Sequence, residues 1–101
     1  MTVLYISEFS DEAQTVRGHA PFAQQPAIAE QTVVIGAGSL QSSAFTASTT
    51  FVRIETDAIC SIAFGTNPTA TATKARMAAN SVEYFGVPLG QSYKVAVITN
   101  T

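Results

Sequence analysis

The chain has 101 residues, charged side chains make up 12% of it, and its net charge at pH 7 is −2. This length supports one core, and a hydrophobic fraction of 47% excludes a disordered chain. The five basic residues stand singly, so we expect no nucleic-acid partner. No apolar run has the length of a membrane span and the N-terminus lacks signal-peptide features, so we expect no membrane partner and synthesis in the cytoplasm.

The first predicted element is a short strand over residues 2–6, "TVLYI". Residues 7–30 show no sustained period and contain two prolines, which predicts an irregular arm or long loop, with a brief helical turn near "SDEAQ" capped by Ser10. Such a long irregular segment in a small domain is often functional. We therefore expect a single β domain over residues 1–101, in which the arm contacts a neighbouring subunit. The interface candidates in the arm are Phe9, Arg17, His19 and Phe22.

The next segment, "QTVVIGAGSLQSSAF" at residues 31–45, resembles the start of a dinucleotide-binding unit. Gly36 and Gly38 fit the first two glycines of the G-x-G-x-x-G pattern, but the third place holds Gln41. The segment that would form the helix is rich in Ser and Thr and has no apolar stripe. The sequence instead predicts a strand, a turn at residues 36–39 and a returning strand, with no helix.

The second half alternates in the manner of strands. "TFVRIET" predicts Val52 and Ile54 on one face, and "AICSIAF" predicts Ala58, Cys60, Ile62 and Phe64 facing inward. "GTNPTATATKA" is typical of a turn and loop, and the strands "SVEYFGV" and "YKVAVIT" follow on either side of the turn "PLGQ". Apolar residues on both parities of the last two strands predict burial on both sides. The fold class is therefore all-β, a small antiparallel β-sandwich or barrel of jelly-roll-like type.

Few residues are candidates for chemistry. The single histidine, His19, has no fixed partners in the sequence pattern, and the single Cys60 excludes an internal disulfide and a Cys-pair zinc site. Cys60 is expected to be a small buried apolar residue. Glu55 and Asp57 are two residues apart and would project on one side of an extended chain, as a glycosidase pair or a cation site requires. An exposed strand face beside Arg53 explains them better, so we expect no catalytic, cofactor or metal site and no enzymatic activity.

The C-terminal half resembles small virion proteins of tailed bacteriophages and prophages. The resemblance lies in the "VRI" and "CSIAFG" strands, the "NPTAT" loop, the "RMAAN" segment, the "EYFGV" strand and the closing "KVAVI". It implies a non-enzymatic structural protein of the particle, made in the host bacterium and located in the virion. The part it favours is a head decoration or cement protein that binds the major capsid protein or another virion protein.

The low charge and the many Ala, Val, Ile and Phe residues favour a homo-oligomer that buries apolar surface, and the resemblance favours a trimer. The alternative function is a β-sandwich that binds a small molecule or carbohydrate, including a module of the neck, tail or fibre, with Glu55, Asp57 or His19 as its polar groups.

Overall fold

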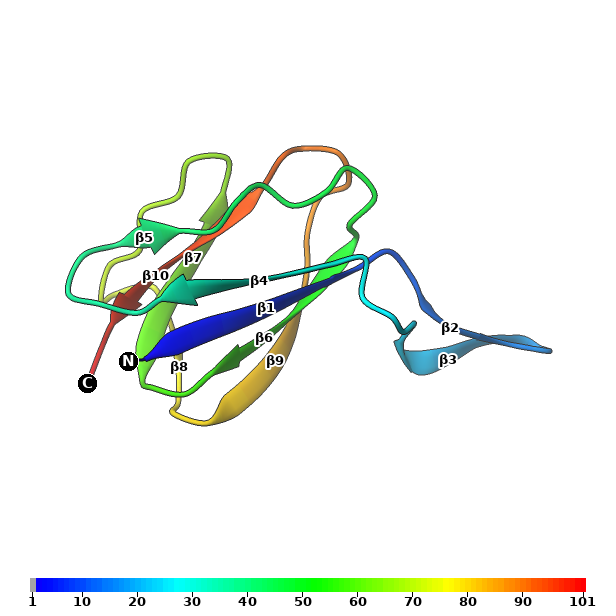
Figure 1. Cartoon of the computed structure of the whole chain (residues 1–101), viewed down its shortest axis with the longest axis horizontal. Helices are drawn as coiled ribbons and strands as arrows, with labels where there is room; N and C mark the ends of the chain where they lie inside the picture. The colour runs from blue at the N-terminus through cyan, green and yellow to red at the C-terminus, as the bar shows by residue number, and fades with distance from the viewer. Residues whose placement is uncertain (1) are drawn as a thin grey trace.

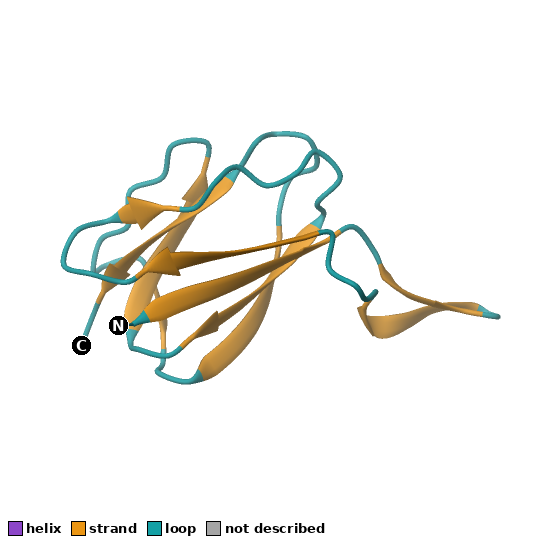
Figure 2. Ribbon diagram, viewed as in Figure 1, coloured by secondary structure: helices purple, strands orange, loops and turns teal. Residues whose placement is uncertain are grey.

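The computed structural model describes residues 2–101, and these form an all-β molecule of two packed sheets with a projecting hairpin (Figures 1 and 2). Its extents are 46 × 27 × 21 Å. The strands are β1 (Val3–Phe9), β2 (Glu12–Thr15), β3 (Gly18–Ala23), β4 (Ala29–Val34), β5 (Leu40–Gln41), β6 (Phe51–Thr56), β7 (Cys60–Gly65), β8 (Ala75–Met77), β9 (Ser81–Gly86) and β10 (Lys94–Thr99). No helix among these residues is long and apolar enough to cross a membrane.

The strand order is a circular permutation of the order found in a jelly roll. The first sheet has the order β4-β1-β6-β9, the second has the order β5-β10-β7-β8, and every pairing in them is antiparallel. Moving β1 to the end of the chain would give the strand order of an eight-stranded jelly roll. The predicted jelly-roll-like β-sandwich is therefore confirmed.

The core lies between the sheets and follows from the alternation of side chains along each strand. Val52 and Ile54 of β6 are fully buried, whereas Arg53 and Glu55 face outward, as the sequence predicts. From the second sheet, Cys60 and Ile62 of β7 face the same layer. Phe64 of β7 meets Phe85 of β9 across the two sheets with ring centroids 5.2 Å apart. These inward residues give the sandwich one apolar layer shared by both sheets.

The turn at residues 36–39 connects the two sheets. The prediction of two strands with an intervening turn and no helix is confirmed, because β4 ends at Val34 and β5 begins at Leu40. The interpretation of β5 as a strand returning along β4 is wrong, since β5 pairs with β10 in the other sheet. The same turn holds both chain ends. The Ile35 N–H donates to the Thr2 carbonyl oxygen at 3.0 Å, and the Thr99 N–H donates to the Gly36 carbonyl oxygen at 2.9 Å.

The outer faces of the two sheets differ in how the chain covers them. Residues 66–74 fold over the second sheet, where Ala70 is buried and the Gln41 side chain donates to the Pro68 carbonyl oxygen at 2.8 Å. This cover explains why β10 buries both parities, as predicted. The same prediction for β9 is wrong, because β9 is an edge strand that exposes Val82 and Tyr84.

The prediction of an irregular arm over residues 7–30 is not confirmed. β1 continues to Phe9, β4 begins at Ala29, and the residues between them include the antiparallel hairpin β2–β3. The helical turn expected near Ser10 is also wrong, because Glu12 begins a strand. The hairpin projects from the end of the molecule opposite both termini (Figure 1).

A buried carboxyl group ties the first sheet to the loop between β5 and β6. Glu8 of β1 faces inward on the same parity as Leu4 and Ile6 and is 2% exposed. Its Oε1 accepts hydrogen bonds from the Thr46 N–H and from the Thr49 hydroxyl, both at 2.8 Å. Because Thr49 donates its proton to Glu8, the Thr46 hydroxyl must donate to Thr49, whose Oγ1 lies 2.7 Å away. The Gln31 amide donates to Oε2 at 3.4 Å.

We expect Glu8→Ala to lower the free energy of unfolding by about 3 kcal/mol, because it leaves a cavity and removes the acceptor of two buried donors. Glu8→Gln keeps the shape of the side chain and one acceptor oxygen, so we expect it to lower the free energy of unfolding by only about 1 kcal/mol. Urea denaturation measures both values. Glu55→Ala on the outer face of the same sheet is the control and should change stability by less than about 0.5 kcal/mol. Equal losses for Glu8→Ala and Glu55→Ala would contradict this role of Glu8.

Candidate functional site: the hairpin and the groove at its base

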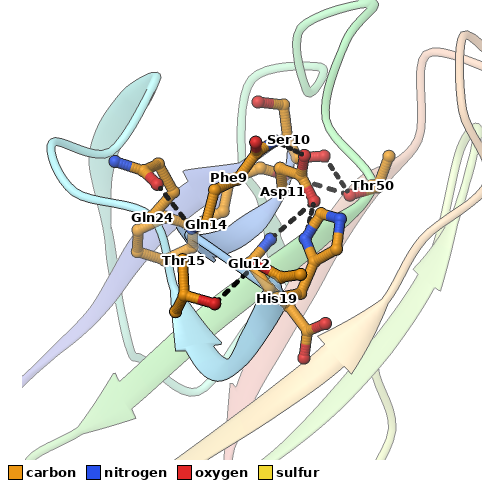
Figure 3. A network of polar contacts seen from close by, with 10 residues as sticks. Phe9, Ser10, Asp11, Glu12, Gln14, Thr15, His19, Gln24 and Thr50 are labelled. Atoms are coloured by element: carbon orange, nitrogen blue, oxygen red, sulfur yellow. Dashed lines mark hydrogen bonds and ion pairs between the residues drawn. The ribbon is translucent and has the colours of Figure 1, made fainter.

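The base of the hairpin is held by a network around Asp11 (Figure 3). One carboxylate oxygen accepts from the Glu12 N–H at 2.8 Å and lies 3.4 Å from Nδ1 of His19 on β3. The other accepts from the Gln14 side-chain amide at 3.2 Å. The Gln24 N–H donates to the Asp11 carbonyl oxygen at 3.1 Å, which closes the base. These bonds position the hairpin through local polar contacts rather than through a core.

The tip of the hairpin is a two-residue loop that exposes an apolar side chain. Thr15 pairs with Gly18, whose φ of +136° favours glycine, and the Thr15 hydroxyl donates to the Gly18 carbonyl oxygen at 3.0 Å. Val16 and Arg17 occupy the loop, and Val16 has a relative exposure of 102%. Arg17 forms no ion pair with any of residues 2–101. The tip therefore offers an uncovered apolar group next to a free cation.

The interface residues predicted from sequence lie in two environments. Arg17, His19 and Phe22 are on the hairpin and exposed, Phe22 by 63%. Phe9 is 1% exposed, because its ring stacks on Phe51 of the neighbouring strand with centroids 5.3 Å apart. Phe9 is thus buried within the folded sandwich, whereas the interface role of Arg17, His19 and Phe22 stays a prediction.

A groove of about 480 Å³ lies between the hairpin and the edge strand β9. An aromatic row across the outer face of the first sheet leads into it: Phe9, Phe51 and then Tyr84, whose ring centroid is 6.2 Å from that of Phe51. Tyr84 ends the row and is 55% exposed. The groove is lined by Glu12, Pro21, Phe22, Ala23, Phe51, Tyr84, Phe85 and Gly86.

Gly86 helps to keep this groove open. It stands opposite Phe51 in the β6–β9 register, so β9 places no side chain directly across from that ring. A Cβ atom added to Gly86 would meet nothing within 4 Å, and the residue does not have a positive φ. A larger side chain at this position would therefore enter the groove without strain in the backbone.

The carboxylates and the histidine considered for catalysis do not form a common site. Glu55 lies on the outer face of β6 with Arg53, whose guanidinium is 3.5 Å away. Asp57 follows the end of β6, and its Oδ1 accepts from the Val3 N–H at 2.9 Å. His19 is on the hairpin beside Asp11. Within residues 2–101, no three His, Cys, Asp or Glu side chains gather closely enough to hold a metal ion.

Cys60 is buried in the core, as its strand parity predicts. Its Sγ lies 3.6 Å from the Thr56 hydroxyl oxygen. Burial raises the pKa of the Cys60 thiol above its ordinary value, and the nearby Asp57 carboxylate acts in the same direction. A thiol whose pKa is raised by folding stabilises the folded state at pH values below its ordinary pKa. This contribution to stability is lost as the pH rises through the raised pKa.

We expect a thiol reagent to label native Cys60 at least a hundredfold more slowly than the denatured chain, since attack needs an exposed thiolate. Absorbance of the released reagent group measures both rates. An Ala47→Cys variant, which adds a thiol in an exposed loop, is the control for reagent activity. Labelling of native Cys60 as fast as that of the added thiol would contradict its burial.

Sequence reasoning missed the buried carboxyl of Glu8 and, apart from Phe22, the residues that line the groove. The signal for Glu8 was its place in the Leu4–Ile6–Glu8 alternation, which puts an acid among inward residues. Gly86 carries a weaker signal, because a glycine near the end of an apolar strand often marks a close approach or an open site. The pairing of β6 with β9 is needed to bring Phe51 and Gly86 together, and no local pattern specifies it.

Comparison with protein-family models, with curated proteins and with solved structures finds no match. Function must be argued from the hairpin and the groove.

Proposed function

We propose that this chain is a non-enzymatic structural protein of a phage particle, a head decoration or cement protein that binds the capsid shell. The observation that carries the proposal is the projecting hairpin, whose Val16 side chain is fully exposed at the tip. The hairpin strands pair only with each other among residues 2–101, so this element adds nothing to the sheets of the sandwich. An apolar group presented in this way fits contact with another protein surface.

The outer face of the first sheet supports the same function. Tyr5, Val34, Val82 and Tyr84 are large hydrophobic side chains that this face leaves exposed by 42–55%. Residues 66–74 fold over the other sheet, whereas these four side chains of the first sheet stay exposed. Exposed apolar residues gathered on one face are typical of subunits that bury it against a partner. The partners proposed are further copies of this chain, with a trimer favoured, and the major capsid protein, in the virion.

The hairpin can be removed with little disturbance to test this function. The Gln24 N–H already bonds to the Asp11 carbonyl oxygen, so an Asn-Gly pair in place of residues 12–23 would make a two-residue turn on that bond. We expect the parent to be bound in many regular copies to purified phage particles, and the shortened chain to be bound at least tenfold less. Mass spectrometry counts the copies and electron cryomicroscopy locates them.

Glu55→Gln and Asp57→Asn are the binding controls and should bind particles as the parent does, and His19→Gln is a third control, which should keep the fold. Thermal unfolding shows that the shortened chain keeps its sandwich. Absence of the parent from particles would contradict the proposed function. An enzymatic activity that one of the three controls abolishes would contradict its non-enzymatic character.

A second candidate function, carbohydrate binding, is favoured by the aromatic groove. Phe22, Phe51 and Tyr84 bring their rings to one groove, and the carboxylate of Glu12 supplies a hydrogen-bond acceptor in its wall. Aromatic rings beside a polar group are a common way to bind and orient a small ligand.

If a sugar binds in this groove, we expect Tyr84→Ala to weaken it about tenfold or more, because the exposed ring ends the aromatic row. Screening on a glycan array followed by titration calorimetry provides the measurement. Tyr5→Ala is the matched control, since Tyr5 is exposed on the same face but does not line the groove. Equal effects of the two substitutions would place the sugar elsewhere.

A further inference from the structure

We propose that the groove at the base of the hairpin receives the hairpin tip of a second copy of this chain, and that three copies close into a ring in this way. The inference rests on the proposed structural function and names the partner of the hairpin. The contact joins the loop of Val16 and Arg17 on one copy to the groove of Phe51, Tyr84 and Gly86 on the next.

The hairpin needs a partner for energetic reasons. A two-stranded hairpin alone is at best marginally stable in water. This hairpin pairs with no strand of the sandwich in residues 2–101, and its tip residue Val16 is entirely exposed. Burying that tip against another surface would stabilise the hairpin and remove apolar area from water.

The groove matches the tip in chemistry. It is mainly apolar, with the rings of Phe51 and Tyr84 as its floor and no side chain at Gly86. Its wall also contains Glu12, whose carboxylate has no ion-pair partner among residues 2–101. Arg17 at the tip also has no ion-pair partner among residues 2–101. An apolar group and a free cation on the tip thus correspond to an apolar floor and a free carboxylate in the groove.

The geometry requires this contact to be made between copies. The tip lies at the far end of the hairpin, whereas the groove is lined by Phe22 and Ala23 near its base (Figure 1). Every copy therefore has one tip and one groove on different surfaces, so two copies can exchange tips reciprocally or several copies can join head to tail. Head-to-tail contacts satisfy every copy when they close into a ring. Three members is the number favoured under the proposed function.

The first test is the mass of the parent and of two matched glycine variants by light scattering at micromolar concentration. We expect the parent at about three times the 10.6 kDa of one chain. Gly86→Lys fills the groove with a cation and should give a monomer, whereas Gly38→Lys should keep the parent mass. A Cβ atom at either glycine meets nothing within 4 Å, so neither change strains the fold. Slow labelling of Cys60 verifies that both are folded.

The second test shows whether the tip of one copy enters the groove of another. Val16→Asp removes the apolar tip and Gly86→Lys blocks the groove, and each variant alone should weaken association at least tenfold. Their equimolar mixture should contain a dimer, because the intact tip of the Gly86→Lys chain can enter the intact groove of the Val16→Asp chain. A cysteine pair, Val16→Cys in one chain and Gly86→Cys in the other, should cross-link the two chains under oxidation.

A monomeric parent, a trimeric Gly86→Lys variant or a mixture that stays monomeric would each overturn the proposal. If the parent is monomeric but still binds particles through its hairpin, the ring is wrong and the proposed function stands. If the ring forms and particles lack the protein, the ring stands and the proposed function is wrong.

Discussion

The burial of one apolar layer between two four-stranded sheets is the constraint on which the rest of this structure depends. Each sheet has a second face that a chain of 101 residues must either cover or leave to water. The chain covers the face of the second sheet with residues 66–74, held by Gln41 and by the bond from the Asn100 amide to the Ala72 carbonyl oxygen at 3.2 Å. On the outer face of the first sheet Phe9 is buried, but Tyr5, Val34, Val82 and Tyr84 remain exposed and available for contact.

The connection between β4 and β5, residues 35–39, has a structural role that its sequence does not indicate. Its Gly-Ala-Gly sequence resembles a phosphate loop, but its backbone serves to cross from one sheet to the other and to bind both chain ends. Thr2 and Thr99 both bond to this segment, and β1 takes the place in the first sheet that the last strand holds in an ordinary jelly roll. The first and last strands therefore lie beside the same crossing between the sheets (Figure 1).

The strands in the second half of the chain could be predicted because their burial follows a period of two. Val52 and Ile54 face inward and Arg53 faces outward, so the pattern alone indicates both the strand and its buried side. The hairpin could not be predicted in this way, because Glu12 and Gln14 are held by polar bonds to Asp11 and Gln24 and a bulge interrupts the register. The burial of Phe9 and the groove depend on strand pairing between distant segments, which no local pattern encodes.

The edge strand β9 bears on how a partner would contact the first sheet in the proposed assembly. Edge strands invite uncontrolled pairing with other chains, and an inward-pointing charge is one device that prevents it. Glu83 stands opposite the buried Ile54 and so has the inward parity, yet it remains exposed at the edge of the sandwich. A strand added beside β9 would bring its own residues against this carboxylate. A partner that inserts side chains over Tyr84 and Gly86 avoids the carboxylate, which favours docking of a hairpin tip in the groove over extension of the sheet.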